Sequence, residues 1–306
     1  MPLSHFPPQL KLFVRDWLSA NNVLLKGPEG HVLVDSGYVQ DVPRTLELLT
    51  APDALGSEPL AQVVNTHCHS DHMGGNAALA RRYGCPVAIP EGEAPFIEAW
   101  DQVALFLDFA DQEADRFSPD RSLVAGTTEV WGGLEWRILA APGHDMGALV
   151  FHNPERRILI SGDALWGNGF GFVMPADFEP EGLKAARATL EMIAKLDVRV
   201  VIPGHGEPFT DFEAALDRAM RRLRAFEADP LRLTRHAPRV ILAYALLHRK
   251  RLPLAELPAY VERVGLHREF NRRYFQLTPE AFAEWLVTEL EKSGAVRREA
   301  GFVVPA

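Results

Sequence analysis

The sequence predicts an α/β fold in which helices cover β-sheets. Short apolar segments with the character of strands alternate along the chain with segments of helical spacing, and this alternation is typical of layered α/β packing. The 306 residues are enough for one large domain and a small additional one. The balance of 47% hydrophobic and 24% charged residues is that of an ordinary globular protein, so disorder is not expected.

The first part of the chain shows this alternation most regularly. Residues 22–35 predict two short strands around a Gly-Pro-Glu-Gly turn, and residues 42–50 predict a helix. Residues 61–65 form an apolar strand that ends in the polar run THCHSDH. A helix that a glycine closes is expected over 74–84, followed by a strand over 85–89.

Residues 91–120 predict a helical insertion. Large apolar side chains recur in it at roughly helical spacing: Phe96, Trp100, Leu105, Phe106 and Phe109. In one interpretation the insertion is a helix that faces the core. In the other it is a lid whose apolar face covers a substrate pocket.

A second, antiparallel sheet is predicted in the middle of the chain. Its strands are expected at 123–130, 134–141, 148–152 and 157–161. After them we expect a helix over 180–196, a strand over 198–203 and a helix over 210–228. The last of these helices carries four arginines, which predict a solvated face: Arg218, Arg221, Arg222 and Arg224.

A domain boundary is predicted near Asp229-Pro230. It divides the chain into a catalytic domain over 1–228 and a small helical domain over 229–306. The second domain is expected to contain helices at 239–249, 254–264 and 279–293, followed by two short strands around Glu299–Gly301. A helix, a glycine and two short strands are how a winged-helix module ends.

Charge and cysteine content restrict the partners and the compartment. The net charge of −9 repels phosphate backbones, so nucleic acid is a disfavoured partner and a small-molecule substrate is expected, with homo-oligomer formation left open. The two cysteines are too few for a disulfide scaffold, which favours the cytoplasm. No apolar stretch approaches the roughly 18 residues that a membrane span needs.

The segment from Thr66 to His72, THCHSDH, predicts a metal site. His67 and His69 are two residues apart in an extended stretch, so both imidazoles point the same way. The chain then turns, which lets Asp71 and His72 reach a second point nearby. Imidazole together with carboxylate suits zinc, and also iron or manganese.

Three later strand ends repeat this layout. In each, a hydrophobic strand delivers a ligand-type residue to its carboxyl end, next to a glycine: His144 in APGH, Asp163 in ILISGD and His205 in VVIPGHG. Four strand ends that present such residues at one rim predict a single site.

These motifs resemble the signature of the metallo-β-lactamase-fold superfamily, His-x-His-x-Asp-His followed by Gly-Gly, with the later motifs in the same order. The resemblance covers about residues 20–225 and implies an αββα sandwich with two metal ions, zinc being expected, at one edge of the sheets. It implies the following ligands: His67, His69 and His144 for the first metal, Asp71, His72 and His205 for the second, and Asp163 as the bridge. The C-terminal part resembles the winged-helix-like domain of some β-lactamase-like hydrolases.

Two departures from the family pattern bear on the substrate. Asp145 follows His144, where many relatives have a hydroxyl residue, and this alters the hydrogen bonding behind the ligands. The segment after Asp163 reads ALWGNGFGF and differs from the cysteine-glycine-arginine segment of glyoxalase II. Glutathione thioesters therefore become a less secure prediction, while His69 favours hydrolysis over the oxygen reduction of flavodiiron relatives.

The loop after Asp163 is expected to border the cleft. Its aromatic residues are the candidates for substrate contact: Trp166, Phe170 and Phe172. Its glycines serve either the turn itself or the substrate. Cys68 is expected to pack in the core, and Asp35 to orient a turn or a group behind the ligands. Four isolated histidines are interpreted as structural: His152, His236, His248 and His267.

The predicted reaction is hydrolysis of a thioester, ester or lactone by a hydroxide shared between the two metals, with Asp71 or Asp163 accepting the proton. Two other functions stay open. One is a phosphodiesterase or ribonuclease that uses the basic cluster His248–Arg251. The other is a winged-helix binding protein with a vestigial metal site.

Overall fold

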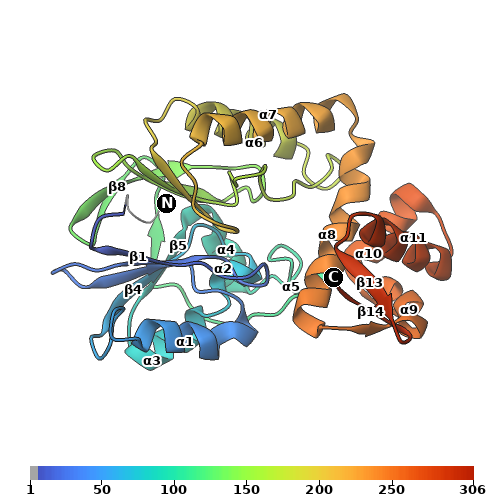
Figure 1. The fold of residues 1–306 in the computed structure, drawn as a ribbon, viewed down its shortest axis with the longest axis horizontal. Coiled ribbons are helices and arrows are strands. Elements are labelled where there is room, and N and C mark those ends of the chain that lie inside the picture. Colours follow the sequence, from blue (N-terminus) through green and yellow to red (C-terminus); the bar gives the residue numbers. More distant parts are fainter. Residues whose placement is uncertain (1–5) are drawn as a thin grey trace.

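Two β-sheets pack face to face at the centre of the structure, a computed structural model that describes residues 6–306 (Figure 1). The first sheet has the order β1-β2-β3-β4-β5-β6: β1 (Leu10–Phe13), β2 (Asn22–Leu25), β3 (His31–Val34), β4 (Leu60–Val64), β5 (Val87–Pro90) and β6 (Arg121–Leu123). Its strands β1 to β3 are antiparallel, and β3 to β6 are parallel.

The second sheet has the order β11-β10-β9-β8-β7: β7 (Thr128–Trp131), β8 (Leu134–Ala140), β9 (Leu149–Asn153), β10 (Ile158–Gly162) and β11 (Val200–Pro203). It is antiparallel except for the parallel pair of β10 and β11. The prediction of an antiparallel second sheet is thus confirmed for four of its five strands.

Side-chain alternation along these strands builds three cores. Val64 and Ile160 lie in the core between the sheets, whereas their neighbours Val63 and Leu159 face outward into separate cores. Helices cover both outer faces: α1 (Val42–Thr50) and α3 (Asn76–Tyr83) on the first sheet, α6 (Gly182–Ile193) and α7 (Phe212–Ala228) on the second. This confirms the predicted αββα sandwich.

The C-terminal part follows α7 as a mainly helical unit at one end of the sandwich (Figure 1). It contains α8 (Leu231–Arg249), β12 (Leu252–Pro253), α9 (Leu257–Arg263), α10 (Gly265–Phe270), a π-helical turn (Asn271–Phe275), α11 (Pro279–Lys292), β13 (Val296–Glu299) and β14 (Phe302–Pro305). The three strands form a small sheet of order β12-β14-β13, and a separate hydrophobic core joins it to the helices. The winged-helix assignment stays a prediction.

Two local predictions differ from the structure. Residues 91–120 form short pieces instead of one helix: 3₁₀ turn Glu91–Glu93, α4 (Ala94–Ala99) and α5 (Leu107–Ala110). Trp100, Phe106 and Asp111 adopt positive φ angles of 52°, 56° and 55°; the first ends α4, and the other two flank α5. Residues 123–130 are divided between β6 and β7, so one predicted strand is two strands in different sheets.

The remaining elements are short. Helix α2 (Ser70–Met73) follows β4, and 3₁₀ turns occupy Val39–Asp41 and Leu254–Glu256. Within residues 6–306, none of the helices combines the length and the apolar character that crossing a membrane requires.

Candidate metal centre

All seven side chains that the resemblance implies as ligands lie together at one edge of the sandwich. Four of them follow β4, and His144, Asp163 and His205 follow β8, β10 and β11. After β4 the backbone of His69 is extended, and α2 begins at the next residue. This change from extended chain to helix aims the two histidines before the turn and the two ligands after it at different points.

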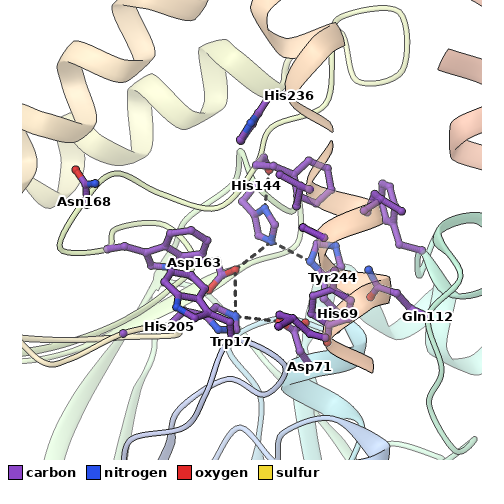
Figure 2. A pocket seen from close by; sticks show the side chains of 18 of the residues that line it. Trp17, His69, Asp71, Gln112, His144, Asp163, Asn168, His205, His236 and Tyr244 are labelled. Carbon is purple, nitrogen blue, oxygen red and sulfur yellow. Dashed lines mark hydrogen bonds and ion pairs between the residues drawn. The ribbon is translucent and has the colours of Figure 1, made fainter. Parts of the chain in front are cut away.

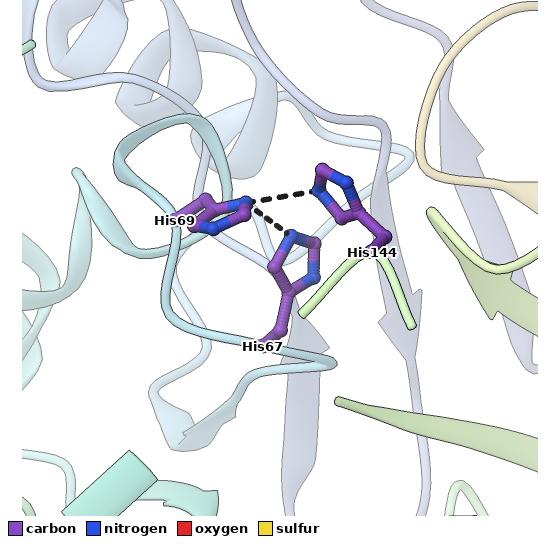
Figure 3. Close-up of side chains that lie close together, drawn as sticks. All are labelled: His67, His69 and His144. Carbon is purple, nitrogen blue, oxygen red and sulfur yellow. Dashed lines mark hydrogen bonds between the residues drawn. The ribbon is translucent and has the colours of Figure 1, made fainter. Parts of the chain in front are cut away.

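The first group consists of three imidazoles that converge on one point (Figure 3). His69 Nδ1 lies 3.2 Å from His67 Nε2 and 2.9 Å from His144 Nε2. Burial lowers the pKa of His67 well below its ordinary value and the pKa of His69 to about 4, so these rings are neutral near pH 7. Neutral ring nitrogens that face one another present lone pairs to a shared cation.

The second group consists of Asp71, His72 and His205. His205 Nε2 lies 2.9 Å from Asp71 Oδ2, and His72 Nε2 lies 3.9 Å from the same oxygen. His72 is completely buried, and its Nε2 atom has no hydrogen-bond partner among the described residues. A buried, unpaired nitrogen is costly, by about 1–3 kcal/mol, unless a cation occupies the space in front of it.

Asp163 lies between the two groups (Figure 2). Its Oδ1 atom is 3.4 Å from His72 Nε2, and its Oδ2 atom is 3.4 Å from His144 Nε2. Burial disfavours the charged carboxylate, but His205, His72 and His144 outweigh burial and hold the pKa of Asp163 well below its usual range. One oxygen therefore faces each group, the position required of a bridging ligand.

The donor set fits two divalent cations. Each group offers three imidazole or carboxylate atoms within 4.8 Å of one another, and the orphaned nitrogen of His72 points to a missing partner. Imidazole and carboxylate are ligands of zinc, iron and manganese alike. The residues thus favour a pair of transition-metal ions without selecting one metal.

Asp35 fixes the ligands from behind, as the sequence predicts. Its carboxylate accepts hydrogen bonds from the Thr66 backbone at 2.9 Å, the Thr66 hydroxyl at 2.9 Å and His72 Nδ1 at 2.8 Å. Burial disfavours the charged His72 ring, but Asp35, Asp71 and Asp163 raise its pKa well above the ordinary value. A metal at His72 Nε2 would displace the second proton of this ring, while Asp35 holds the first proton on Nδ1.

The other two supports come from the loops after β8 and β10. His144 Nδ1 donates to the Phe172 carbonyl at 2.6 Å, which directs Nε2 to the first group. Asp145 Oδ2 lies 3.7 Å from His69 Nε2, and the amide of Gly147 donates to Asp145 Oδ1 at 2.7 Å. Asp145 thus stands behind a ligand at the position where many relatives have a hydroxyl residue.

Asp145 is itself paired with a second buried carboxyl group. Burial and the neighbouring Asp145 charge raise the pKa of Glu93 well above its ordinary value, and Glu93 is hydrogen-bonded to Asp145. The Glu93 carboxyl group is therefore protonated and donates a hydrogen bond to Asp145. Asp145 remains ionised beside His69.

A cavity of about 700 Å³ opens above this centre (Figure 2). Its lining is largely apolar and comes from both parts of the chain: Trp17, Phe106, Trp166, Phe172, Val240, Ile241, Tyr244 and Leu247. At the rim, the exposed ring of Trp17 stacks on His205 at a centroid distance of 5.4 Å. A cavity of this size and lining is typical of sites for small organic molecules.

The predicted substrate contacts separate into two sets. Trp166 and Phe172 line the cavity, whereas Phe170 is only 2% exposed and packs in the core below it. Within the insertion, Phe106 lines the cavity, while Leu105 and Leu107 are buried in the core on the outer face of the first sheet. Some side chains of the insertion thus face the core and others face the cavity, and its role as a lid over a substrate stays a prediction.

Other lining residues could not be identified from the sequence. Trp17 lies outside every motif, and Arg222 belongs to a helix whose arginines predict a solvated face. Tyr244 lines the cavity from α8 and donates to the Leu18 carbonyl at 2.7 Å. His236, interpreted as structural, also lines the cavity. The positions of Arg222, His236 and Tyr244 follow from the packing of α7 and α8, which leaves no local sequence signal.

Comparison with known proteins agrees with this geometry. The pattern of the Metallo-beta-lactamase superfamily matches residues 15–205. The chain is 26% identical over 209 residues to the acyl-coenzyme A thioesterase MBLAC2 of Gallus gallus, covering 62% of this chain and 73% of that one. It is 30% identical over 120 residues to a hydroxyacylglutathione hydrolase of Hyphomonas neptunium, covering 39% and 40%.

Solved structures show the same fold. A metallo-beta-lactamase family protein of Thermus thermophilus superimposes with a TM-score of 0.59 at 24% identity, over 98% of this chain and 99% of that one. The protein TTHA1623, in a di-iron-bound form, gives a TM-score of 0.54 at 26% identity, over 68% and 96%. The superfamily pattern spans all seven residues of the metal centre, and the chain therefore belongs to the metallo-beta-lactamase superfamily of hydrolases.

Proposed function

We propose that the protein is a binuclear metal-dependent hydrolase of carbonyl compounds: thioesters, esters or lactones. The observation that carries this proposal is the position of Asp163, which has one carboxylate oxygen toward each group of ligands at the base of an apolar cavity. The two relatives named above, an acyl-coenzyme A thioesterase and a hydroxyacylglutathione hydrolase, both hydrolyse thioesters.

Two divalent cations, zinc being the expected metal and iron or manganese the alternatives, would lower the pKa of a shared water toward neutrality and polarise a carbonyl oxygen. His67, His69 and His144 would hold one ion, and Asp71, His72 and His205 the other, with Asp163 between them. Asp71 lines the cavity, and although burial disfavours its charge, His72 and His205 lower its pKa. The carboxylate is therefore ionised and can accept a hydrogen bond from the attacking water, while its lowered pKa makes it a weak base; Asp71 or Asp163 is the proposed acceptor of the proton.

The lining of the cavity favours an acyl substrate. Phe106, Phe172 and Ile241 give it an apolar surface from three separate elements, which would exclude water from the scissile bond. Glutathione thioesters are a weaker candidate, since ALWGNGFGF replaces the glyoxalase II segment after Asp163.

The alternative functions gain less support. Nucleic-acid binding needs cations free to meet phosphates, but in the basic cluster Arg249 is paired with Asp111. On the C-terminal hairpin, Arg298 is paired with Glu284 and Glu291. A binding protein with a vestigial site would not need to retain all seven ligands together.

We further propose that residues 1–228 form the catalytic domain and residues 229–306 a separate C-terminal domain. One helix, α7, ends and another, α8, begins at that boundary. A winged-helix identity, a cytoplasmic location and a homo-oligomer remain part of this proposal. The cytoplasmic location is supported by Cys68 and Cys85, which are both free and buried.

A substrate panel tests the proposed function. Protein loaded with zinc, iron or manganese would be assayed on acyl thioesters, lactones, a β-lactam and bis-p-nitrophenyl phosphate, with metal content measured on the same samples. Turnover of a thioester or lactone is expected. Turnover of the phosphodiester alone would show that the carbonyl proposal is wrong.

A further inference from the structure

Arg222 places a positive charge in the cavity wall without a negative partner. Its side chain is half-buried and lines the cavity from α7. Among the described residues it has two hydrogen-bond partners, both neutral: the Phe170 carbonyl, 3.1 Å from Nη1, and His236 Nε2, 2.8 Å from Nη2. Burial is the cause that lowers the pKa of Arg222, but a guanidinium stays charged at any physiological pH.

The surroundings of Arg222 hold the guanidinium in place without neutralising it. The group lies over the rings of Phe170 and Phe226, 5.2 and 5.5 Å from their centroids. Burial, together with Arg222 and Arg239, lowers the pKa of His236 to about 3, so its ring is neutral and Nε2 is an acceptor. A guanidinium has five N–H donors, and only two are engaged here.

A neighbouring arginine shows that this arrangement is particular to Arg222. Arg218 lies one helical turn earlier on α7 and also binds the loop after Asp163, through the Gly167 carbonyl at 2.8 Å. Unlike Arg222, it pairs with a carboxylate, Asp211, at 2.7 Å, and it does not line the cavity. The charge of Arg218 is therefore balanced within the protein, and that of Arg222 is not.

The cavity itself supplies no suitable anion. Its acidic lining residues are Asp71 and Asp163, which belong to the metal centre, and Glu207, which is exposed. A partly buried cation in an apolar lining loses hydration, and an anion arriving with the substrate would restore that loss. The planar fork of a guanidinium matches the two oxygens of a carboxylate or phosphate.

We propose that Arg222 is a specificity-determining residue that binds an anionic group of the substrate, with His236 as the residue that positions it. This inference rests on the proposed function and narrows it to thioesters or esters that carry a carboxylate or phosphate. Figure 2 shows His236 beyond His144 and away from Asp71, so an anion bound near His236 would lie on the His144 side of the metal centre.

Kinetics with paired substrates test the proposal. Glutaryl and valeryl thioesters differ by a terminal carboxylate, and each would be prepared on coenzyme A, which carries phosphates, and on N-acetylcysteamine, which is neutral. Arg222→Gln should lower kcat/KM by about 10- to 100-fold, mainly through KM, for the thioesters that carry the anion bound by Arg222. It should leave kcat/KM for the neutral valeryl N-acetylcysteamine thioester unchanged. Arg222→Lys should restore part of the loss, and Arg218→Gln should show no selective effect.

The arms of this experiment identify the source of the anion. Selective loss with the glutaryl group on both thiols places the carboxylate of the acyl chain at Arg222. Selective loss with coenzyme A alone places a phosphate of the leaving group there. An equal loss for charged and neutral substrates, or no loss at all, would overturn the proposal, because the role of Arg222 would then be structural or absent.

A binding measurement keeps the inference testable if no thioester, ester or lactone is hydrolysed, an outcome that would reject only the proposed function. Metal-loaded parent, Arg222→Gln and Arg218→Gln would be titrated calorimetrically with glutarate and with free coenzyme A. Arg222→Gln should bind at least one of the two probes about tenfold more weakly than the other two proteins do. Equal affinities of all three proteins for both probes would reject the anion site.

Discussion

At the scale of single residues, the chemistry of the metal centre depends on a few carboxylates that each contact several partners. Asp163 faces both groups of ligands, and Asp35 accepts four hydrogen bonds behind them. Because both carboxylates are buried, their charges act on the neighbouring histidines with little screening by solvent. Removing Asp163 should take away a metal ligand, whereas removing Asp35 should disturb the orientation of the ligand His72.

Asp163→Ala is expected to remove metal and activity together. The variant loses an oxygen from each group of ligands, so the loss of metal affinity should exceed the roughly 10- to 100-fold that removal of an outer partner causes. Metal per protein by elemental analysis and thioester turnover would be measured on the same preparation. Full metal content with full turnover would contradict the bridging assignment.

Asp35→Asn is expected to weaken metal binding while leaving every ligand in place. Asparagine tolerates the positive φ of 56° at this position, so the backbone should be preserved. The amide cannot hold the His72 proton as the carboxylate does, and metal affinity should fall about 10- to 100-fold in a chelator competition. Asp53→Asn, at an exposed carboxylate, is the matched control, and equal affinities of the two variants would refute this role of Asp35.

At the scale of elements, the strand ends could be predicted from the sequence, and the connections between them could not. Asp163 and His205 each follow a fully buried strand and stand next to a glycine, so periodicity and motif agree at those positions. The breaks at Trp100 and Phe106 have no such signal, because residues of this type rarely adopt positive φ. Which residues line the cavity, such as Trp17 and Arg222, depends on how segments that are distant in the sequence pack together.

The loop after Asp163 shows how tightly an element can be restricted by the ligands beside it. A Cβ atom on Gly171 would lie 2.6 Å from His144 Cγ and Nδ1 and 3.0 Å from Asp163 Cβ. Gly167, in the same loop, has space for a methyl group, since its nearest neighbour would be a Phe209 ring atom at 3.6 Å. The two glycines therefore provide a matched pair of alanine substitutions.

Gly171→Ala is expected to displace His144 from the Phe172 carbonyl and to reduce metal affinity about tenfold or more, with overpacking costing about 1–3 kcal/mol in stability. Gly167→Ala should retain the metal content of the parent protein after dialysis. Thermal unfolding with and without added metal would be measured for both variants. The steric explanation fails if the two alanine variants keep the same amount of metal.

At the scale of the whole molecule, the C-terminal unit lines the cavity above the candidate metal centre. Helix α8 supplies Ile241 and Tyr244 to the cavity wall, while its other face packs in the separate C-terminal core. Asp111, directly after α5, binds Arg249 at 2.8 Å and Arg263 at 3.2 Å, and it accepts from the Tyr260 hydroxyl at 3.2 Å. This contact joins the two parts beside the cavity.

Asp111→Asn is expected to loosen that junction in a pH-dependent manner. Burial disfavours the Asp111 charge, but Arg249 and Arg263 outweigh burial and lower the pKa of Asp111 below its usual value. A carboxylate with a depressed pKa in the folded state stabilises the protein above its unfolded pKa of about 3.9, and this contribution is lost as the pH falls through the folded value. The parent should therefore be about 1–3 kcal/mol more stable than Asp111→Asn above about pH 5, with the difference shrinking below pH 4.

Thermal unfolding of the parent and of Asp111→Asn between pH 3 and pH 8 measures this difference. Asp115→Asn is the control, because Asp115 forms an exposed ion pair with Arg81 that should contribute little at any pH. Since α8 forms one wall of the cavity, Asp111→Asn should also raise KM for an acyl substrate at neutral pH while metal content is unchanged. A stability difference that is the same at pH 3 and pH 8 would mean that the charge of Asp111 does not hold the two parts together.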